Sequence, residues 1–470
     1  MIGAAINIIP LMIQRNVPGI GPHVLLAFAI AVVPAVLAAL AYAILGSGMP
    51  RAGGSYVYAS RALHPFLGFV ASFSQWFGLS IAIGVVSYVL IFFLRDIANA
   101  LGWGDLARVL ASGLPHLAIA LAFLWTSTAV NLLGLKVYER TLVPLMFLMF
   151  IGGAVVIPAG FAFDHRDFAA ALLAREGVAL PEADPAPLSF ATLLPATAIL
   201  FSSFIGFDYI AQAGGEARSP HRNLPLAIGI AIGVVATYYL LFTAAIYHAV
   251  PWQFVAERAL SSDLTAPGLL GYLLSPGWTV AVVAGASIAL VNDLPAMVLA
   301  VSRLMFAWAE DGIFPRAAAA VNRRFRTPHV AIVASSLTAS ASIFGCHLAG
   351  DFFLGVDILV TSMLVNFLMM CLSVLALPRT NPALASELRF GRSRPAQLLI
   401  CGAGTLLLSV LLAAQTAKDL GSRVPAWYFH STYLWLAVMT VASLVFAREW
   451  KKLRRAGVDL KARFSMLPPS

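Results

Sequence analysis

Apolar runs long enough to cross a lipid bilayer recur along the whole chain. About 20 mainly apolar residues span the roughly 30 Å of membrane hydrocarbon when they form a helix. Only 11% of the residues are charged, whereas soluble proteins carry about 25%. The sequence therefore predicts an all-α polytopic membrane protein. The runs lie at residues 24–46, 65–94, 113–134, 141–163, 190–213, 225–250, 277–307, 328–348, 352–377, 397–416 and 430–447.

The positive charge of the chain follows these runs. A net charge of +9 is compatible with nucleic-acid binding, but its distribution indicates a membrane topology instead. If the chain starts inside and crosses at each run, most lysines and arginines fall on the starting side, including those at 448–463. Loops rich in these residues stay in the cytoplasm. We therefore expect a multi-pass protein of the inner or plasma membrane, embedded in lipid with both termini in the cytoplasm, and no nucleic-acid partner.

One run contains a glycine and a carboxylate near its middle, Gly206 and Asp208. Glycine makes unwinding of a helix easy, and a charge near the membrane centre costs roughly 3 kcal/mol on insertion scales. This combination is tolerated mainly where a helix is broken around a ligand or an ion. The run at 190–213 therefore predicts a transporter with part of its site at this break.

The start of the chain carries a similar pattern. Ile2-Gly3 precedes Asn7, and Ile205-Gly206 precedes Asp208, each within an apolar run. Interrupted helices at matching positions of two halves are typical of an inverted repeat with a binding site at the bilayer midplane.

Three groups of residues form motifs at the ends of apolar runs. The first is Met49-Pro50-Arg51-Ala52-Gly53-Gly54-Ser55-Tyr56-Val57-Tyr58 with Leu67-Gly68-Phe69; the second is Phe204-Ile205-Gly206-Phe207-Asp208 with Glu216, Pro220, Arg222-Asn223 and Pro225; the third is Ser302-Arg303, Ala309-Glu310-Asp311-Gly312, Pro315 and Thr327-Pro328. Together they resemble the amino acid–polyamine–organocation (APC) superfamily, and within it the bacterial and archaeal amino-acid permeases. The order and spacing agree along essentially the whole chain.

The resemblance implies a leucine-transporter-like fold of about twelve transmembrane helices. Helices 1–5 and 6–10 would form two inverted repeats at about 1–163 and 190–377, within one membrane domain at 1–470. Two accessory helices at about 397–447 and a basic cytoplasmic tail at 448–470 would follow.

The resemblance also implies a substrate site where helices 1 and 6 are unwound. In such permeases helix 1 offers backbone N–H groups to a substrate carboxylate and helix 6 offers carbonyl oxygens to its ammonium group. Helix ends suit this task because they expose unpaired donors and acceptors. The expected substrate-binding residues are Gly3, Ala4, Ala5, Phe204, Gly206, Phe207 and Asp208.

Two features depart from the family pattern. Ala5 stands where the family has a second glycine, and its methyl group narrows the expected binding site for the substrate carboxylate. Asn7 stands where an aromatic residue is usual. The sequence also begins inside the first break. We expect that the start codon is misassigned; the alternative is that the protein lacks half of its inner gate.

Two intramembrane acids are candidates for coupling to an ion. Asp208 could sense protons, hold a substrate ammonium group or cap the unwound helix, and a purely structural carboxylate is the alternative. Asn292 and Asp293 lie near the middle of the run at 277–307. A buried carboxylate there could bind sodium or cycle a proton, or it could face a water-filled vestibule.

Arg303, Glu310 and Asp311 lie at the cytoplasmic end of the same run. Ion pairing among them would hold an inner gate shut, and a loop that only sets topology is the alternative. For polar residues on the third and tenth helices we expect mainly interhelical hydrogen bonds. These are Ser74, Gln75, Thr361, Ser362 and Asn366.

The sequence thus indicates a secondary active transporter that moves an amino acid by proton or sodium coupling. It has no Walker motif and no catalytic cluster or metal-ligand spacing, so we expect no enzyme activity, cofactor or resident metal. An exchanger of polyamines or cationic amino acids is the alternative, because Asp208 and Asp293 could balance a second positive charge. A nutrient sensor with the same fold also stays open. The sequence leaves the substrate and the oligomeric state undetermined.

Overall fold

The protein is helical throughout the part that the computed structural model describes, which is residues 4–111, 113–134, 140, 144, 147, 155–212, 214, 217 and 219–468. The helices are α1 (Ala4–Asn16), α2 (Val24–Gly48), α3 (Gly54–Ala62), α4 (Pro65–Ala100), α5 (Gly104–Ala111), α6 (Gly113–Leu133), α8 (His165–Glu176), α9 (Phe190–Phe201), α10 (Asp208–Gln212), α11 (Pro220–Ala249), α12 (Trp252–Ser261), α13 (Ala266–Leu270), α14 (Pro276–Glu310), α15 (His329–Ala349), α16 (Phe353–Thr380), α17 (Pro382–Ser386), α18 (Arg394–Gly421), α19 (Ser431–Arg455) and α20 (Leu460–Ser465). A short 3₁₀ turn, η2 (Ser202–Phe204), follows α9.

Within these described residues, nine helices are long and apolar enough to cross a membrane. They coincide with the predicted runs, which confirms the prediction of an all-α polytopic membrane protein. The run at 190–213 is not one helix but is divided among α9, η2 and α10. Most of the run at 141–163 lies outside the described residues.

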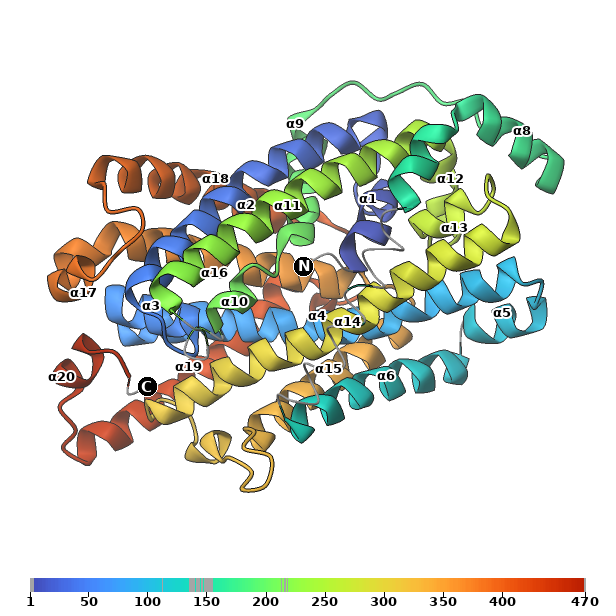
Figure 1. The fold of residues 1–470 in the computed structure, drawn as a ribbon. Coiled ribbons are helices and arrows are strands. Elements are labelled where there is room, and N and C mark those ends of the chain that lie inside the picture. Colours follow the sequence, from blue (N-terminus) through green and yellow to red (C-terminus); the bar gives the residue numbers. More distant parts are fainter. Residues whose placement is uncertain are drawn as a thin grey trace.

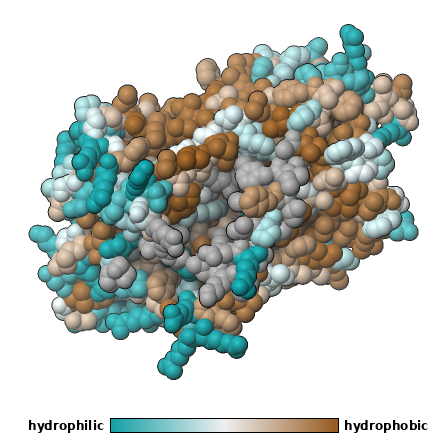
Figure 2. Space-filling model, in the orientation of Figure 1, coloured by the Kyte–Doolittle hydropathy of each residue, from teal (hydrophilic) through white to brown (hydrophobic). Residues whose placement is uncertain are grey.

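The core of the bundle is built around α4. This helix packs along α14, α15 and α16, while α2 packs along α11 and α9. The most apolar segment of α4 is 83% buried, whereas those of α18 and α19 are only 28% buried. Apolar side chains cover the middle of the visible surface and hydrophilic ones gather towards its two ends, as expected of a bilayer-spanning bundle (Figure 2).

The bundle has two distinct ends (Figure 1). One end, here called the tail end, carries α3, α17 and α20. The other, here called the loop end, carries α5, α8, α12 and α13. Helix α1 starts at Ala4 midway between them and runs towards the loop end. The broken segment between α9 and α10 lies at a similar depth, and α1 contacts η2 within the bundle.

Candidate functional site at the broken helix

The break predicted at Gly206 lies between α9 and α10. After η2 the backbone becomes extended at Ile205, with φ −67° and ψ 139°. Gly206 then adopts φ 132°, a conformation that residues with a Cβ atom rarely adopt. A glycine is therefore required for the chain to leave one helix and begin the next.

Asp208 caps this unwound segment. Its carboxylate is fully buried. One oxygen accepts a hydrogen bond of 2.9 Å from the backbone N–H of Gly206, and the other accepts one of 2.5 Å from the side-chain amide of Gln75 on α4. Both oxygens thus have partners within the protein, the geometry expected of a structural cap.

The Asp208 cap belongs to a larger polar network. The Gln75 side-chain oxygen accepts hydrogen bonds from the hydroxyl of Ser55 and from the amide of Gln212, the latter at 3.1 Å. The backbone N–H of Gly53 donates to the carbonyl of Gln212 at 3.1 Å. The motif that follows the second helix is therefore bound directly to α10, and it braces the broken helix from the tail end.

Two consecutive glycines let the motif approach so closely. A Cβ atom on Gly53, which has φ 81°, would lie 2.4 Å from the Cβ of Ala307. A Cβ atom on Gly54 would lie 2.6 Å from the carbonyl oxygen of Ala211. Both distances are too short for any side chain, so this glycine pair is a packing requirement between α3, α10 and α14.

Phe204 and Phe207 are fully buried among aromatic rings. Phe204 packs against Phe28 at a centroid distance of 5.1 Å. Phe207 packs against Tyr42 at 5.7 Å and stacks on Phe367 at 5.1 Å. These contacts fix the two ends of the break to α2 and α16.

Of the expected helix-1 residues, Gly3 lies outside the described part of the chain, and Ala4 and Ala5 form the first residues of α1. Helix α1 contacts η2 and α9. The structure therefore brings α1 beside the segment that leads into the break.

A cavity of about 70 Å³ lies beside the break. Its walls come from α1, α4, η2 and the start of α16. Neither Phe204, Phe207 nor Asp208 lines it. Its lining residues are Ile8, Ile9, Ala82, Val85, Val86, Val89, Ser202, Phe352, Gly355, Val356 and Leu359.

Asn292 and Asp293 lie near the middle of α14, where they are half-buried. Asp293 and Asp208 both interact electrostatically with Tyr209 on α10. The side-chain oxygen of Asn292 is buried and has no hydrogen-bond partner among the described residues. The structure thus brings both predicted acids within electrostatic range of one tyrosine.

At the tail end, the carboxylate of Asp311 pairs with Arg61 of α3 at 2.6 Å and accepts a hydrogen bond of 2.7 Å from the hydroxyl of Tyr56. The sequence grouped Asp311 with Arg303 and Glu310 and missed Arg61. Glu310 is exposed, and its backbone carbonyl accepts a hydrogen bond of 3.0 Å from Arg463 of α20.

The C-terminal segment covers this ion pair. The guanidinium of Arg61 donates a hydrogen bond of 3.2 Å to the carbonyl of Met466 and lies over the ring of Phe464 at 5.0 Å. Arg51 donates to the carbonyl of Pro468 at 3.0 Å. The tail is thus bound to the helix that braces the break.

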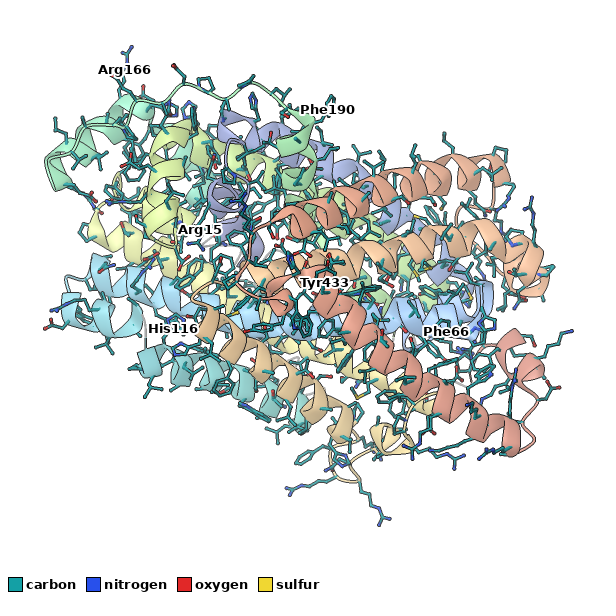
Figure 3. The ribbon with its side chains drawn as sticks, turned by 180° about the vertical axis from the view of Figure 1, so that it is seen from behind. Arg15, Phe66, His116, Arg166, Phe190 and Tyr433 are labelled. Carbon is teal, nitrogen blue, oxygen red and sulfur yellow. The ribbon has the colours of Figure 1, made fainter. Side chains whose placement is uncertain are left out.

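The loop end is closed by a second ion-pair group that the sequence analysis did not single out. Arg15, in the last turn of α1, contacts Asp263 at 3.1 Å and Asp351 at 3.3 Å. Arg15 lies among the helices, whereas Arg166 of α8 projects away from the bundle (Figure 3). In the sequence, Arg15 is visible only as a cation near the end of the short apolar segment that precedes the run at 24–46.

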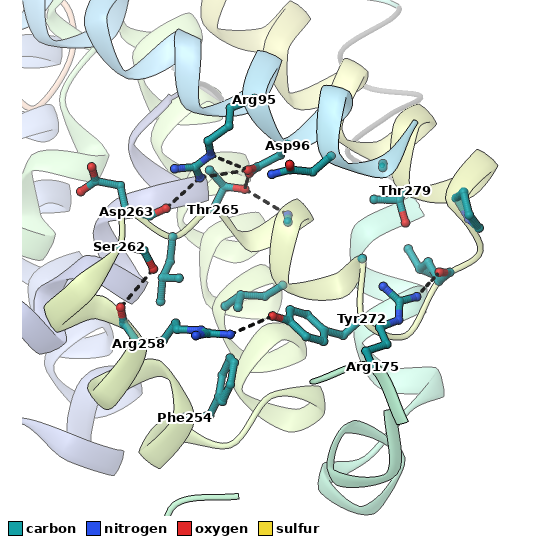
Figure 4. Close-up of a pocket in the computed structure, with 18 residues that line it drawn as sticks. Arg95, Asp96, Arg175, Phe254, Arg258, Ser262, Asp263, Thr265, Tyr272 and Thr279 are labelled. Atoms are coloured by element: carbon teal, nitrogen blue, oxygen red, sulfur yellow. Dashed lines mark hydrogen bonds and ion pairs between the residues drawn. The ribbon is translucent and has the colours of Figure 1, made fainter. Parts of the chain in front are cut away.

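A polar pocket of about 620 Å³ adjoins this closure (Figure 4). Arg95 pairs with Asp96 at 2.9 Å, and the hydroxyl of Thr265 donates to Asp96 at 2.6 Å. Burial raises the pKa of Asp263, against the opposing effect of Arg15. Since its carboxylates are engaged by cations or hydroxyl groups, this pocket resembles a structural polar network more than an open ligand site.

The expected interhelical hydrogen bonds form at Ser74, Gln75 and Asn366. The buried hydroxyl groups of Thr361 and Ser362 have no hydrogen-bond partner among the described residues. The hydroxyl of Ser74 donates to the carbonyl of Ser362 at 3.1 Å. The amide of Asn366 donates to the hydroxyl of Tyr42 at 2.6 Å. These bonds tie α4 and α2 to α16 around the break.

Comparison with known proteins agrees with this architecture. The sequence profile of a family described as amino acid permease matches residues 1–443. A human protein named cationic amino acid transporter 4 is 26% identical over 354 residues, which cover 72% of this chain and 52% of the relative. An uncharacterized transporter of Mycobacterium tuberculosis is 29% identical over 339 residues, covering 69% of this chain and 68% of the relative.

A third relative carries a different substrate in its name. A Bacillus subtilis protein named as a branched-chain amino acid permease is 25% identical over 340 residues, covering 66% of this chain and 65% of the relative. The chain spans only about half the length of the human relative. Because the family profile covers nearly the whole chain, this protein belongs to the amino acid permease family of the APC superfamily.

Proposed function

We propose that this protein is a secondary active transporter that moves an amino acid across a cytoplasmic membrane by alternating access. The observation that carries the proposal is the broken helix at Gly206, whose segment η2 lies against α1 inside the bundle. A break at this depth exposes backbone donors and acceptors to a zwitterion, and transporters use such breaks at the bilayer midplane.

Two closures support the alternating-access part of the proposal. Arg61 and Asp311 join α3 to α14 at the tail end, while Arg15 joins α1 to Asp263 and Asp351 at the loop end. A carrier needs a barrier on each side of its site, and opening one barrier at a time moves the substrate. In this proposal the tail end faces the cytoplasm, as the distribution of basic residues favours.

The coupling ion would act near Asp293. Both oxygens of Asp208 already accept hydrogen bonds within the protein, which favours a capping role for that residue. Asn292 next to Asp293 has a buried oxygen without a hydrogen-bond partner in the described chain. A proton or sodium ion bound beside Asn292 and Asp293 would give the Asn292 oxygen a partner and change the charge in the middle of α14.

Uptake into proteoliposomes tests the proposal. Purified protein would be given radiolabelled amino acids of each class, with a sodium gradient, a proton gradient or neither. The account expects saturable uptake that one of the gradients increases, and no uptake into protein-free vesicles. Binding of amino acids without flux would favour a sensor and overturn the proposal.

A further inference from the structure

We propose that the transported amino acid has a neutral aliphatic side chain, of the size of valine or leucine, and that this side chain occupies the cavity lined by α1, α4, η2 and α16. This inference rests on the proposed transport function and specifies its substrate class. Relatives are named for cationic and for branched-chain amino acids, so their names alone do not decide the question.

The cavity lies within reach of a substrate held between α1 and the break at Gly206. Ile8 and Ile9 line it, and a helix rises about 1.5 Å per residue, so these residues follow Ala5 at about 5–6 Å along α1. Ser202 lines it where α9 gives way to η2. The side chain of an amino acid bound between α1 and the break at Gly206 would therefore extend into this cavity.

The walls offer no partner for a charge. Each lining residue is uncharged, and Ser202 is the one polar side chain among them. Its hydroxyl already donates a hydrogen bond of 2.6 Å to the carbonyl of Ile199. An ammonium or guanidinium group placed here would lose its hydration without gaining a carboxylate, which is strongly unfavourable.

The nearby acids are engaged elsewhere. Asp208 accepts hydrogen bonds from Gly206 and Gln75. Asp357 follows a lining residue on α16, but its carboxylate pairs with Lys418 of α18 at 3.2 Å. Asp293 lies on α14, a helix that contributes no lining residue. The surroundings therefore do not supply the second negative charge that a cationic substrate needs.

The volume fits a short branched side chain. A cavity needs a volume of about 10–15 Å³ to hold one water-sized group. The cavity volume of about 70 Å³ therefore has room for around five heavy atoms. The side chains of valine and leucine have three and four carbon atoms, whereas an indole ring is too large. Removal of their apolar surface from water would favour binding.

Competition with the wild-type protein gives the first test. Uptake of radiolabelled L-leucine into proteoliposomes would be measured with a tenfold excess of unlabelled L-valine, L-isoleucine, L-lysine or L-arginine. We expect strong inhibition by L-valine and L-isoleucine. Inhibition by L-lysine and L-arginine should be less than a tenth as large. Transport or competition by lysine and arginine at equal concentrations would overturn it while leaving the proposed transport function intact.

A variant that fills the cavity gives the second test. Ala82→Leu adds three carbon atoms to the wall, so uptake of L-leucine should fall at least tenfold relative to uptake of L-alanine. Ala227→Leu places the same change on an exposed position of α11 and should leave both uptakes unchanged. Equal loss of both substrates in folded Ala82→Leu would contradict the assignment.

If Ala82→Leu fails to fold, Leu359→Ala enlarges the same cavity and should admit L-phenylalanine, raising its uptake at least tenfold relative to that of L-leucine. An unchanged ratio in Leu359→Ala would overturn the assignment. Absence of transport for every amino acid in the wild type would instead overturn the proposed function and this inference with it.

Discussion

The side-chain amide of Gln75 donates a hydrogen bond of 2.5 Å to the carboxylate of Asp208, across 133 positions of sequence. This bond joins the first third of the long helix α4 to the first residue of α10. Through Ser55 and Gln212 it also reaches the motif after the second helix. A conformational change at the break must therefore move these elements together or break this network.

The first prediction concerns the donor and acceptor order of that bond. The carboxylate of Asp208 accepts hydrogen bonds from Gln75 and from the N–H of Gly206, whereas the side chain of an asparagine has only one oxygen. In Asp208→Asn at least one of these buried donors therefore loses its acceptor, which lowers the free energy of unfolding by about 1–3 kcal/mol. We expect a lower thermal unfolding midpoint in detergent. Adding Gln75→Glu restores an acceptor opposite the new amide and should recover part of the loss. Strictly additive effects of the two changes would show that the bond does not contribute to stability.

The second prediction concerns the backbone at Gly206. Its φ of 132° is costly for a residue with a Cβ atom, by about 1–3 kcal/mol. Gly206→Ala should therefore lower the unfolding midpoint and abolish transport. Gly229→Ala on α11 is the matched control, because a Cβ there meets no atom within 4 Å. Equal unfolding midpoints for the two variants would refute the strain at the break.

The third prediction concerns the closure at the tail end. The side chains of Arg61 and Asp311 are only 1% and 7% exposed. Removing one partner of a buried pair costs about 3–5 kcal/mol, whereas replacing both by apolar groups costs much less. Arg61→Met should thus destabilise the protein more than Arg61→Met combined with Asp311→Leu. Arg108→Met, which breaks an exposed pair, serves as the control, and thermal unfolding of all variants gives the comparison.

The fourth prediction is a pH dependence at the loop end. A hydrogen bond from the Tyr272 hydroxyl, assisted by Arg258, holds the pKa of Glu176 below its ordinary value of 4.5. Because the pKa of Glu176 is lower in the folded protein than in the unfolded chain, its ionised carboxylate stabilises the fold at pH values above 4.5. This stabilisation is lost as the pH falls through the folded-state pKa of Glu176. Tyr272→Phe should therefore destabilise the protein at neutral pH, and the difference should shrink in acid. A difference that is constant with pH would exclude this linkage.

Much of the fold follows from the sequence because the bilayer limits the choice of structure. The length and apolarity of the runs alone predict the helices that span the bilayer. Gly206 and Asp208 predict the break, because a carboxylate inside the membrane is unfavourable by roughly 3 kcal/mol and is tolerated mainly where a helix is interrupted. The need for glycine at 53 and 54 is visible as a motif, but its cause, the close approach of Ala307 and Ala211, appears only in three dimensions.

The partners of the charged residues could not be predicted in the same way. Asp311 pairs with Arg61, which lies 250 positions away in the sequence. Which residues meet across helices depends on how each helix is rotated and packed, and a single sequence does not reveal that rotation. The apolar cavity was missed for the same reason, because its walls come from four separate elements.

Counterflow of L-leucine requires alternating access and can be measured without knowledge of the coupling ion. Proteoliposomes loaded with unlabelled L-leucine would be diluted into a trace of radiolabelled L-leucine. The account predicts transient accumulation of label above its equilibrium level, which excess external L-valine suppresses and L-lysine does not. Entry of label at only the rate of protein-free vesicles, with the protein folded and inserted, would contradict the account.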